Sequence, residues 1–345
     1  MKKSIATILL SALSLMAMAQ EEASYYLPRT ALRFTISVEK TSYTPGEFCQ
    51  FAERFLKKRA ESLPSEQFKI IGVQVEGVGV PDTTKQFLAK TDPKRNINMV
   101  NRDANGVLLS INTKLTASQQ PTTAPRRPAQ QPTLNPHDYM GQEILSAGSQ
   151  AKMAELTAQE IYNIRDSKIQ LSRGQADFMP NDGEQMKIML RQLDTQEAAL
   201  LQTFEGITLR DTLHLHVDYM PQKEVSREPL FRFSRHFGLV DADDLSGTPY
   251  YIYIEDLHHM PTIMVAAEQG KKDKKSEGIY VNLPGKIKVT VASDEGRLLS
   301  EDIYAAQFGK MEMIDPNLFS KKLTTSIILN PATGNLESIK TVAEE

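Results

Sequence analysis

The chain has 345 residues, a formal net charge of −3, one cysteine and no tryptophan. Its hydrophobic fraction of 40% is enough for an ordinary core and excludes global disorder. A mildly acidic chain without a dense basic patch is a poor candidate for binding nucleic acid. Because Cys49 is the only cysteine, an intramolecular disulfide is excluded and packing must hold the fold.

The first residues, MKKSIATILLSALSLMAMAQ, are typical of a secretory signal peptide. Two lysines and an apolar run from Ile5 to Leu15 precede the small-x-small sequence Ala17-Met18-Ala19. The run is shorter than the roughly 20 apolar residues of a membrane span. We predict a signal peptide at residues 1–19, whose removal changes the net charge to −5. The mature protein is expected in the periplasm or elsewhere in the cell envelope, including the surface. It has no cysteine at the cleavage point for a lipoprotein and no later segment that could be an integral membrane span.

Residues 20–115 are predicted to form an N-terminal α+β region. The alternation of apolar and polar residues from Leu32 to Val38 predicts a half-buried strand, and an apolar stripe from Phe48 to Phe55 predicts a helix. The sequence FKIIGVQVEGVGV predicts a second strand whose glycines allow bends. Asn105-Gly106, flanked by alternating apolar residues, predicts a hairpin turn.

Residues 116–138 are rich in proline, glutamine and threonine, which predicts a disordered linker. Residues 139–205 are predicted to form a helical hairpin, because two segments repeat apolar residues with a helical period. Asp182 can cap the second helix, with Gln185 as its partner. A hairpin of this length could also bind a partner, although charges of both signs on its polar faces fit exposure to solvent.

Residues 206–345 contain short apolar runs separated by turn residues, which favours a β-sandwich-like C-terminal domain. The lysine-rich sequence EQGKKDKKSEG is predicted to be a solvated loop at the end of a β-hairpin. The expected fold class is α+β, with a β-rich N-terminal sheet and one helix, a helical hairpin insert and a β-sandwich-like C-terminal region. The predicted strands lie near 207–219, 230–237, 249–255, 261–267, 279–291 and 297–305, followed by a hairpin near 322–340.

Several stretches resemble one family in the same order along the chain. They are YYLPRTALRFTISVEKTSYTPGEF, ELTAQEIYNIRDSKIQLSRG, DGEQMKIMLRQLDTQEAALLQTFEG, FRFSRHFGLVDADDLSG, and AQFGKMEMI with LNPATGNL. Together they cover nearly the whole mature chain and resemble exported Bacteroidetes proteins of the domain of unknown function 4831. The resemblance implies an envelope protein of a Bacteroides-like organism. It brings no established activity and no catalytic residues.

That lineage implies O-glycosylation at Asp followed by Ser or Thr and then by an apolar residue or Thr. Asp82-Thr83-Thr84 and Asp211-Thr212-Leu213 fit this pattern. Thr83, in an expected loop, is the better candidate, since Thr212 leads directly into a strand. The alternative is an ordinary turn, in which Asp and Thr side chains bond to the nearby backbone.

His214 and His216, in the sequence TLHLHVDY, are the strongest candidates for metal ligands. Residues i and i+2 of a strand share a face, so the two imidazoles could provide half of a zinc site. Asp218 on the same face, or His258-His259, could complete it. Because no pattern brings the latter pair to the same place, we interpret TLHLHVDY as a polar strand face and assign no metal or cofactor.

No other sequence indicates a catalytic site. Gly-x-Ser-x-Gly is absent, and nothing marks Ser234, near His236, as an activated nucleophile. Cys49 lies beside a helical stripe and fits a packed or half-exposed thiol. The sequence DADDLSG lacks the ligand spacing of a calcium loop and fits an acidic turn.

These observations favour a non-enzymatic envelope protein that binds or scaffolds an envelope protein or glycan. The alternative is an envelope hydrolase acting on glycan or peptide, with a site that forms only in the fold. A deep pocket with two facing carboxylates or a histidine cluster would favour the hydrolase. Shallow surfaces and an exposed apolar patch would favour the binding protein.

Overall fold

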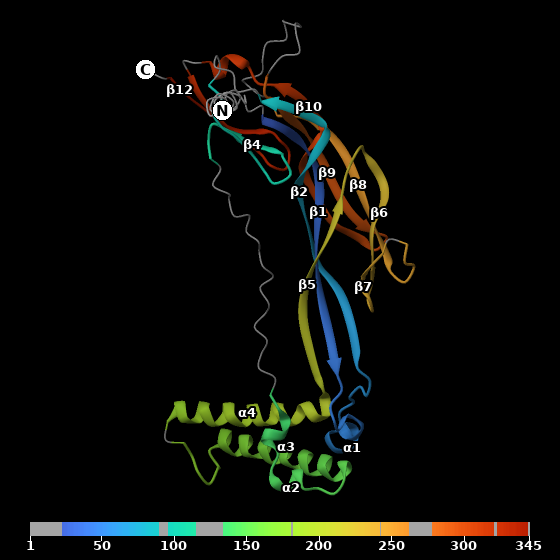
Figure 1. Ribbon diagram of the computed structural model, residues 1–345. Coiled ribbons are helices and arrows are strands. Elements are labelled where there is room, and N and C mark those ends of the chain that lie inside the picture. Colours follow the sequence, from blue (N-terminus) through green and yellow to red (C-terminus); the bar gives the residue numbers. More distant parts are fainter. Residues whose placement is uncertain are drawn as a thin grey trace, which may run out of the picture.

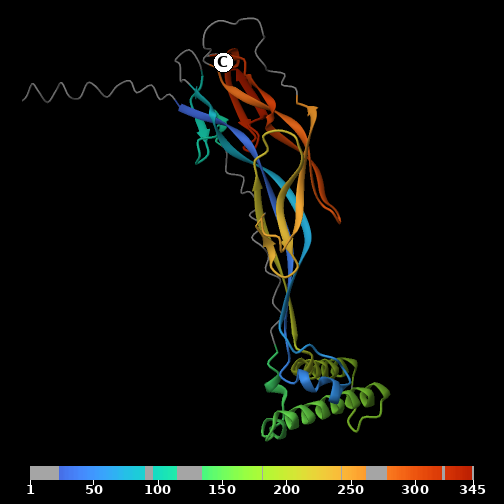
Figure 2. The ribbon, with the colours of Figure 1, turned by 90° about the vertical axis from the view of Figure 1, so that its right-hand side faces the viewer.

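The computed structural model describes residues 23–89, 96–114, 134–180, 182–241, 243–261, 278–320 and 323–343. These residues form an elongated molecule in which a long β-ribbon joins a β-rich part to a helical unit (Figure 1). A view turned by 90° shows the same separation of the two ends (Figure 2). The α+β class predicted from the sequence is confirmed.

Three antiparallel strands form the ribbon, with β1 in the middle. Side chains on one face of β1 are fully buried at Leu32, Phe34, Ile36 and Val38, as their alternation predicts. With 22 residues, β1 is roughly 70 Å long. The ribbon strands are β1 (Ala23–Thr44), β2 (Ser65–Ala89) and β5 (Ile207–Tyr219).

A five-stranded sheet packs on the apolar face of the ribbon, so that the two sheets enclose one sandwich core. The core contains Phe231, Ile252, Ile254 and Val289, which alternate with outward-facing side chains along their strands. The predicted strand at 261–267 lies almost entirely outside the described residues. In spatial order the strands are β10 (Gly296–Met313), β9 (Tyr280–Ser293), β8 (Thr248–His259), β6 (Val225–Ser234) and β7 (Gly238–Val240).

A four-stranded sheet lies at the end of the ribbon away from the helices (Figure 1). It joins two predicted hairpins from opposite parts of the chain, because Ile111 pairs with Ile327. Gly106 has a φ of 84°, which fits the turn expected at Asn105-Gly106. In spatial order the strands are β12 (Leu336–Ala343), β11 (Leu323–Leu329), β4 (Leu108–Ile111) and β3 (Val100–Arg102), and the 3-10 helix η3 spans Pro316–Phe319.

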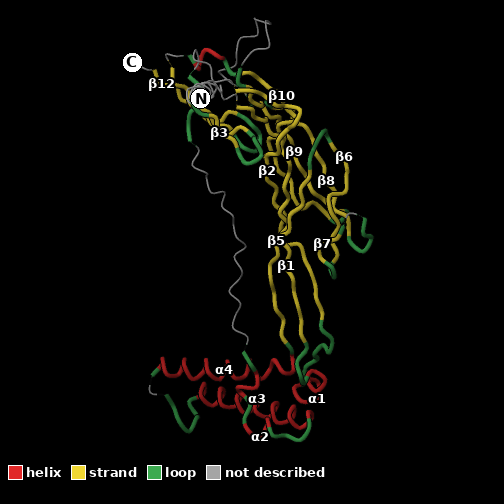
Figure 3. The backbone as a smooth tube through the Cα atoms, in the orientation of Figure 1, coloured by secondary structure: helices red, strands yellow, loops and turns green. Residues whose placement is uncertain are grey.

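The helices gather at the other end of the ribbon and run across its direction (Figure 3). Their core includes Phe48 and Phe204, whose ring centroids lie 5.5 Å apart. The helix predicted after Pro45 is therefore present, but it packs with the hairpin helices. The unit contains the 3-10 helices η1 (Cys49–Phe51) and η2 (Pro136–Tyr139), and α1 (Ala52–Leu56), α2 (Gln142–Leu145), α3 (Gln150–Arg173) and α4 (Gly183–Glu205).

Capping residues determine where the two long helices begin and end. The Asp182 carboxylate accepts a hydrogen bond from the Gln185 N–H at 2.8 Å, which confirms the predicted cap. Gly174 ends α3 with a φ of 68°. Gly206, with a φ of 76°, ends α4 where the chain enters β5. A Cβ at this position would stand less than 3.0 Å from the Thr44 carbonyl oxygen.

One detail differs from the sequence prediction. Pro136 to Asp138, expected in the disordered linker, begin η2, because the Asn135 side chain caps it by accepting the His137 N–H. Most of the predicted linker lies outside the described residues, as does EQGKKDKKSEG except for its last glycine. Cys49 is half-buried, as expected.

The sheets cross the domain boundaries predicted from the sequence, because strands of residues 20–115 pair with strands of residues 206–345. Strand β1 pairs with β5 over thirteen residue pairs, from Leu32–Tyr219 to Thr44–Ile207.

Among the described residues, no helix has the length and apolar character that a membrane span requires.

Candidate functional site

His214 and His216 lie on one face of β5, as the i, i+2 spacing predicts, and both are exposed. Each imidazole faces a hydroxyl of β1. The Nδ1 atom of His214 lies 3.0 Å from Ser37 Oγ, and that of His216 lies 3.1 Å from Thr35 Oγ1. The two rings are therefore part of a polar ladder between neighbouring strands.

The next rung of this ladder is a two-bond ion pair. Arg33 donates to both carboxylate oxygens of Asp218, at 2.8 and 2.9 Å. The hydrogen bond from Arg33 holds the pKa of the Asp218 carboxyl below its usual value. Asp218 thus shares the face of the two histidines, but its oxygens already have a cationic partner.

The other candidate residues lie elsewhere. His258 and His259 end β8, in the five-stranded sheet, whereas His214 and His216 lie on β5, in the three-stranded ribbon. Within the described parts of the chain, no three His, Cys, Asp or Glu side chains form a group that could hold a metal ion. His236 lies in the turn after β6, not in the strand with Ser234, whose hydroxyl accepts the His236 N–H at 3.3 Å.

The two candidate glycosylation sites differ in their surroundings. Thr83 is exposed on a bulge of β2, where the ladder with β1 is interrupted between Pro28–Pro81 and Tyr26–Gln86. Asp82 accepts hydrogen bonds from the N–H and the hydroxyl of Thr84, so the bulge also contains the local bonding that Asp and Thr were expected to make. Thr212 is half-buried within β5.

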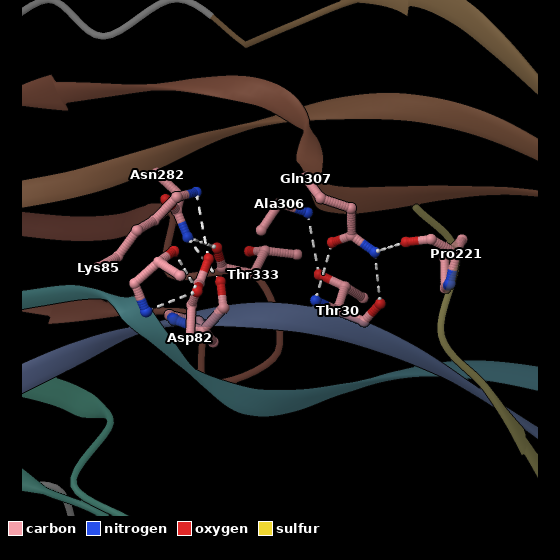
Figure 4. Close-up of polar contacts among 10 residues, drawn as sticks. Thr30, Asp82, Lys85, Pro221, Asn282, Ala306, Gln307 and Thr333 are labelled. Carbon is pink, nitrogen blue, oxygen red and sulfur yellow. Dashed lines mark hydrogen bonds and ion pairs between the residues drawn. The ribbon is translucent and has the colours of Figure 1, made fainter. Parts of the chain in front are cut away.

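A buried polar junction joins the ribbon to the other two sheets (Figure 4). Thr30 is fully buried, and its hydroxyl donates to the Ala332 carbonyl at 2.9 Å and accepts the Ala306 N–H at 3.0 Å. The Gln307 amide accepts the Thr30 N–H and donates to the carbonyls of Thr30 and Pro221. These bonds satisfy backbone groups where β1 and β10 cross.

The second part of the junction is centred on Asn282, which is fully buried and donates to the carbonyls of Pro28 and Thr333, both at 2.9 Å. Close by, Lys85 Nζ lies 3.9 Å from a carboxylate oxygen of Asp82 (Figure 4). Burial alone would raise the pKa of Asp82, but the bonds from Thr84 and the charge of Lys85 outweigh it and lower the pKa. Gln307 of AQFGK, and Ala332 and Thr333 of LNPATGNL, take part in the hydrogen bonds of this junction, so both motifs have a structural role there.

Large apolar side chains are exposed at one end of the hairpin, away from the ribbon. We use the name hairpin tip for residues 169–180 and 182–188, which comprise the end of α3, most of the connector and the start of α4. Phe178 and Ile188 are 70% and 63% exposed, and Ile169 and Met179 are 45% and 37% exposed. This feature was not predicted from the sequence, although Phe178 and Met179, two large apolar residues in the connector SRGQADFMPNDG, were a usable signal.

The surface of the described residues includes two open grooves. One, of about 430 Å³, lies over β6, β8 and β9 and is lined by Tyr253, Glu224, Glu255 and Lys288 among others. The other, of about 580 Å³, lies where the ribbon meets the helices and is lined by Tyr43, Lys58 and Glu205 among others. In the second groove the Tyr43 hydroxyl donates to the carbonyls of Glu61 and Glu205, which ties the ends of all three ribbon strands together.

The fold and these surfaces define an elongated β-rich protein with a helical unit at the end of a ribbon. The chain belongs to the family described as Domain of unknown function (DUF4831), which matches residues 21–337. No match is found among curated proteins or among solved structures.

Proposed function

We propose that the chain is a non-enzymatic binding or scaffold protein of the cell envelope, and that it contacts an envelope protein through the hairpin tip. The observation that carries this proposal is the exposure of four large apolar side chains within residues 169–188. Single exposed apolar residues are common on protein surfaces, whereas larger exposed apolar patches mark interaction sites, and these four side chains all belong to the end of one hairpin.

The geometry supports the proposal because the tip is held far from the rest of the molecule. Helix α4 joins the ribbon at its C-terminal end, and its 23 residues span roughly 34 Å. The tip is at the opposite end of this helix, on the side away from β5 (Figure 1). A partner could therefore reach it without contact with the sheets.

The hairpin is also braced, so that the tip is presented in a defined position. Lys168 of α3 lies 2.6 Å from Asp194 and 2.7 Å from Glu197 of α4, and Arg165 lies 2.7 Å from Glu197. Only 17% of the Glu197 side chain and 19% of the Lys168 side chain are exposed. Partly buried ion pairs of this kind keep the two helices in register.

The hydrolase alternative has less support. Two carboxylates, Glu224 and Glu255, line the groove over β6, β8 and β9, but that groove is open to solvent. Most glycosidases use a pair of carboxyl groups that flank the scissile bond, and a deep pocket rather than an open groove was expected for such a site.

The proposal is tested by photo-cross-linking in cells that make the native protein. A photoreactive amino acid is placed at Phe178, at Ile188 or, as a control, at Phe237. Phe237 is a matched control because it is also a phenylalanine that is 70% exposed, and it lies in the turn between β6 and β7. We expect one reproducible protein product from positions 178 and 188 that is absent from position 237.

A second measurement connects the product to the apolar side chains. The variant with Phe178→Ser and Ile188→Ser should lose the same partner in chemical cross-linking, while Phe237→Ser should keep it. Identical products from all three positions, or full retention of the partner by the double variant, would overturn the proposal.

A further inference from the structure

An open groove on the outer face of the five-stranded sheet combines one aromatic ring with polar side chains and charges of both signs. Its volume of about 430 Å³ falls within the range of volumes that small-molecule sites occupy. This groove is distinct from the hairpin tip, because it lies on the sandwich and the tip lies on the helical unit. The side chains that carry the inference are Tyr253, Glu224, Glu255, Lys288, Ser226 and Thr290.

Strand alternation places these side chains on the outer face. Ile252 and Ile254 are buried in the sandwich core, so Tyr253 between them points outward. Across the ladder, Tyr253 pairs with Thr290 and Glu255 pairs with Lys288. The sequence TPYYIYIEDLHH contains this alternation, although the neighbouring strand could not be inferred from it.

The ring of Tyr253 has no stacking partner, in contrast to that of its neighbour Tyr251. The Arg227 guanidinium lies over the Tyr251 ring, 4.1 Å from its centroid. In the described residues, no aromatic ring and no cation stacks on Tyr253 in this way. Tyr253 therefore offers a half-exposed aromatic surface at the floor of a polar groove.

The polar groups around the ring can both accept and donate hydrogen bonds. Glu224 is held in place, because one of its carboxylate oxygens accepts the Asp256 N–H at 2.9 Å. Thr290 lies 3.2 Å from the Ser300 hydroxyl across the ladder. Carboxylates accept, the Lys288 ammonium donates, and hydroxyls do both. An apolar ring surface surrounded by groups of both kinds matches a sugar, which has a C–H face and a rim of hydroxyls.

The charges in the groove indicate which sugars fit. Two carboxylates and one ammonium leave an excess negative charge, which disfavours acidic sugars such as uronic acids. From this arrangement we infer that the groove binds a neutral saccharide, with one sugar unit stacked on Tyr253 and its hydroxyls bonded to Glu224, Glu255 and Lys288.

The experiment uses the mature chain and three defined probes. They are the trisaccharide of N-acetylglucosamine, maltotriose and, as the acidic comparison, trigalacturonic acid. Binding is measured by saturation-transfer NMR and titration calorimetry. We expect saturable binding of at least one neutral trisaccharide and weaker or no binding of the acidic one.

Variants then test the role of the ring. Tyr253→Ala should weaken binding about tenfold, since it removes the stacking surface, while Tyr253→Phe keeps the ring and should bind within about threefold of the native chain. Tyr304→Ala is the matched control, because Tyr304 is exposed on the same outer face but does not line the groove. Thermal unfolding of each variant shows that the fold is retained.

Three outcomes would overturn the inference. They are the absence of saturable binding by the intact chain for both neutral probes, binding that is unchanged by Tyr253→Ala, and an equal loss in Tyr304→Ala. None of them bears on cross-linking at Phe178, so this inference and the proposed function can fail separately.

Discussion

Gly79 of β2 and Pro331, in the turn between β11 and β12, lie in direct backbone contact. A Cβ on Gly79 would stand less than 3.0 Å from the Pro331 carbonyl oxygen. The ladder partner of Gly79 is Thr30, whose hydroxyl donates to Ala332 in the same turn. The ribbon and the four-stranded sheet therefore meet at a point where a side chain on β2 cannot be accommodated.

The first prediction concerns this contact. Gly79→Ala should reduce the free energy of unfolding by about 3 kcal/mol, because the added methyl group forces two backbones apart. Gly72→Ala is the matched control in the same strand, since a Cβ there would meet nothing within 4 Å. Equilibrium urea unfolding measures both variants, and equal stabilities would contradict the close approach of the two backbones.

The second prediction concerns the hydroxyl at the centre of the junction. Thr30→Val keeps the shape of the side chain but leaves the Ala306 N–H and the Ala332 carbonyl without their partner. An unsatisfied buried polar group costs about 1–3 kcal/mol, so we expect a loss of this size in urea unfolding. Thr208→Val, at an exposed position of β5, should change the stability by less than about 0.5 kcal/mol. A neutral Thr30→Val would contradict the assigned bonds.

The third prediction is a pH dependence of the hairpin. Partial burial alone would raise the pKa of Glu197, but hydrogen bonds from Lys168 and Arg165 outweigh it, so the pKa lies below its ordinary value. A carboxyl whose pKa is lowered by folding stabilises the fold above its unfolded pKa and loses this effect as the pH falls through the folded value. Glu197→Gln should therefore cost about 1–2 kcal/mol at pH 7 and a smaller amount near pH 3.

The measurement is urea unfolding of the native chain and the variant across this pH range. Glu155→Gln is the control, because Glu155 is an exposed residue of α3 that pairs with Lys152 one turn away. It should stay within about 0.5 kcal/mol of the native chain at every pH. A difference for Glu197→Gln that is the same at pH 7 and pH 3 would show that charge is not responsible.

Much of the local structure could be predicted, because its signals are local. The alternation from Ile207 to Tyr219 gave the bounds of β5, and the polar residue at Asp182 gave the start of α4. The partner of β5 could not be predicted, since β1 lies more than 160 residues earlier and any alternating strand presents the same pattern. The exposure of a side chain depends on which elements pack together, so the sequence did not show that Phe178 and Tyr253 are exposed or half-exposed.

The fourth prediction concerns modification of the native protein. The structure leaves Thr83 exposed on a bulge, where an enzyme has access to the hydroxyl, whereas Thr212 is half-buried in a paired strand. If the protein carries an O-glycan at either position, we expect it at Thr83. Mass spectrometry of peptides from the native chain tests this, and Thr83→Val should remove the added mass. Unmodified peptides at both positions would end the hypothesis.

The fifth prediction concerns His214 and His216. Two imidazoles share a face, but a zinc site needs at least three protein ligands, and Asp218 is paired with Arg33. We therefore expect the melting temperature to be the same with zinc and with chelator. A real site would add about 2.7 kcal/mol at 100 times its dissociation constant, which is a measurable shift. A zinc-dependent rise that the double variant His214→Ala and His216→Ala abolishes would show that the strand face binds metal with water or another molecule completing the coordination.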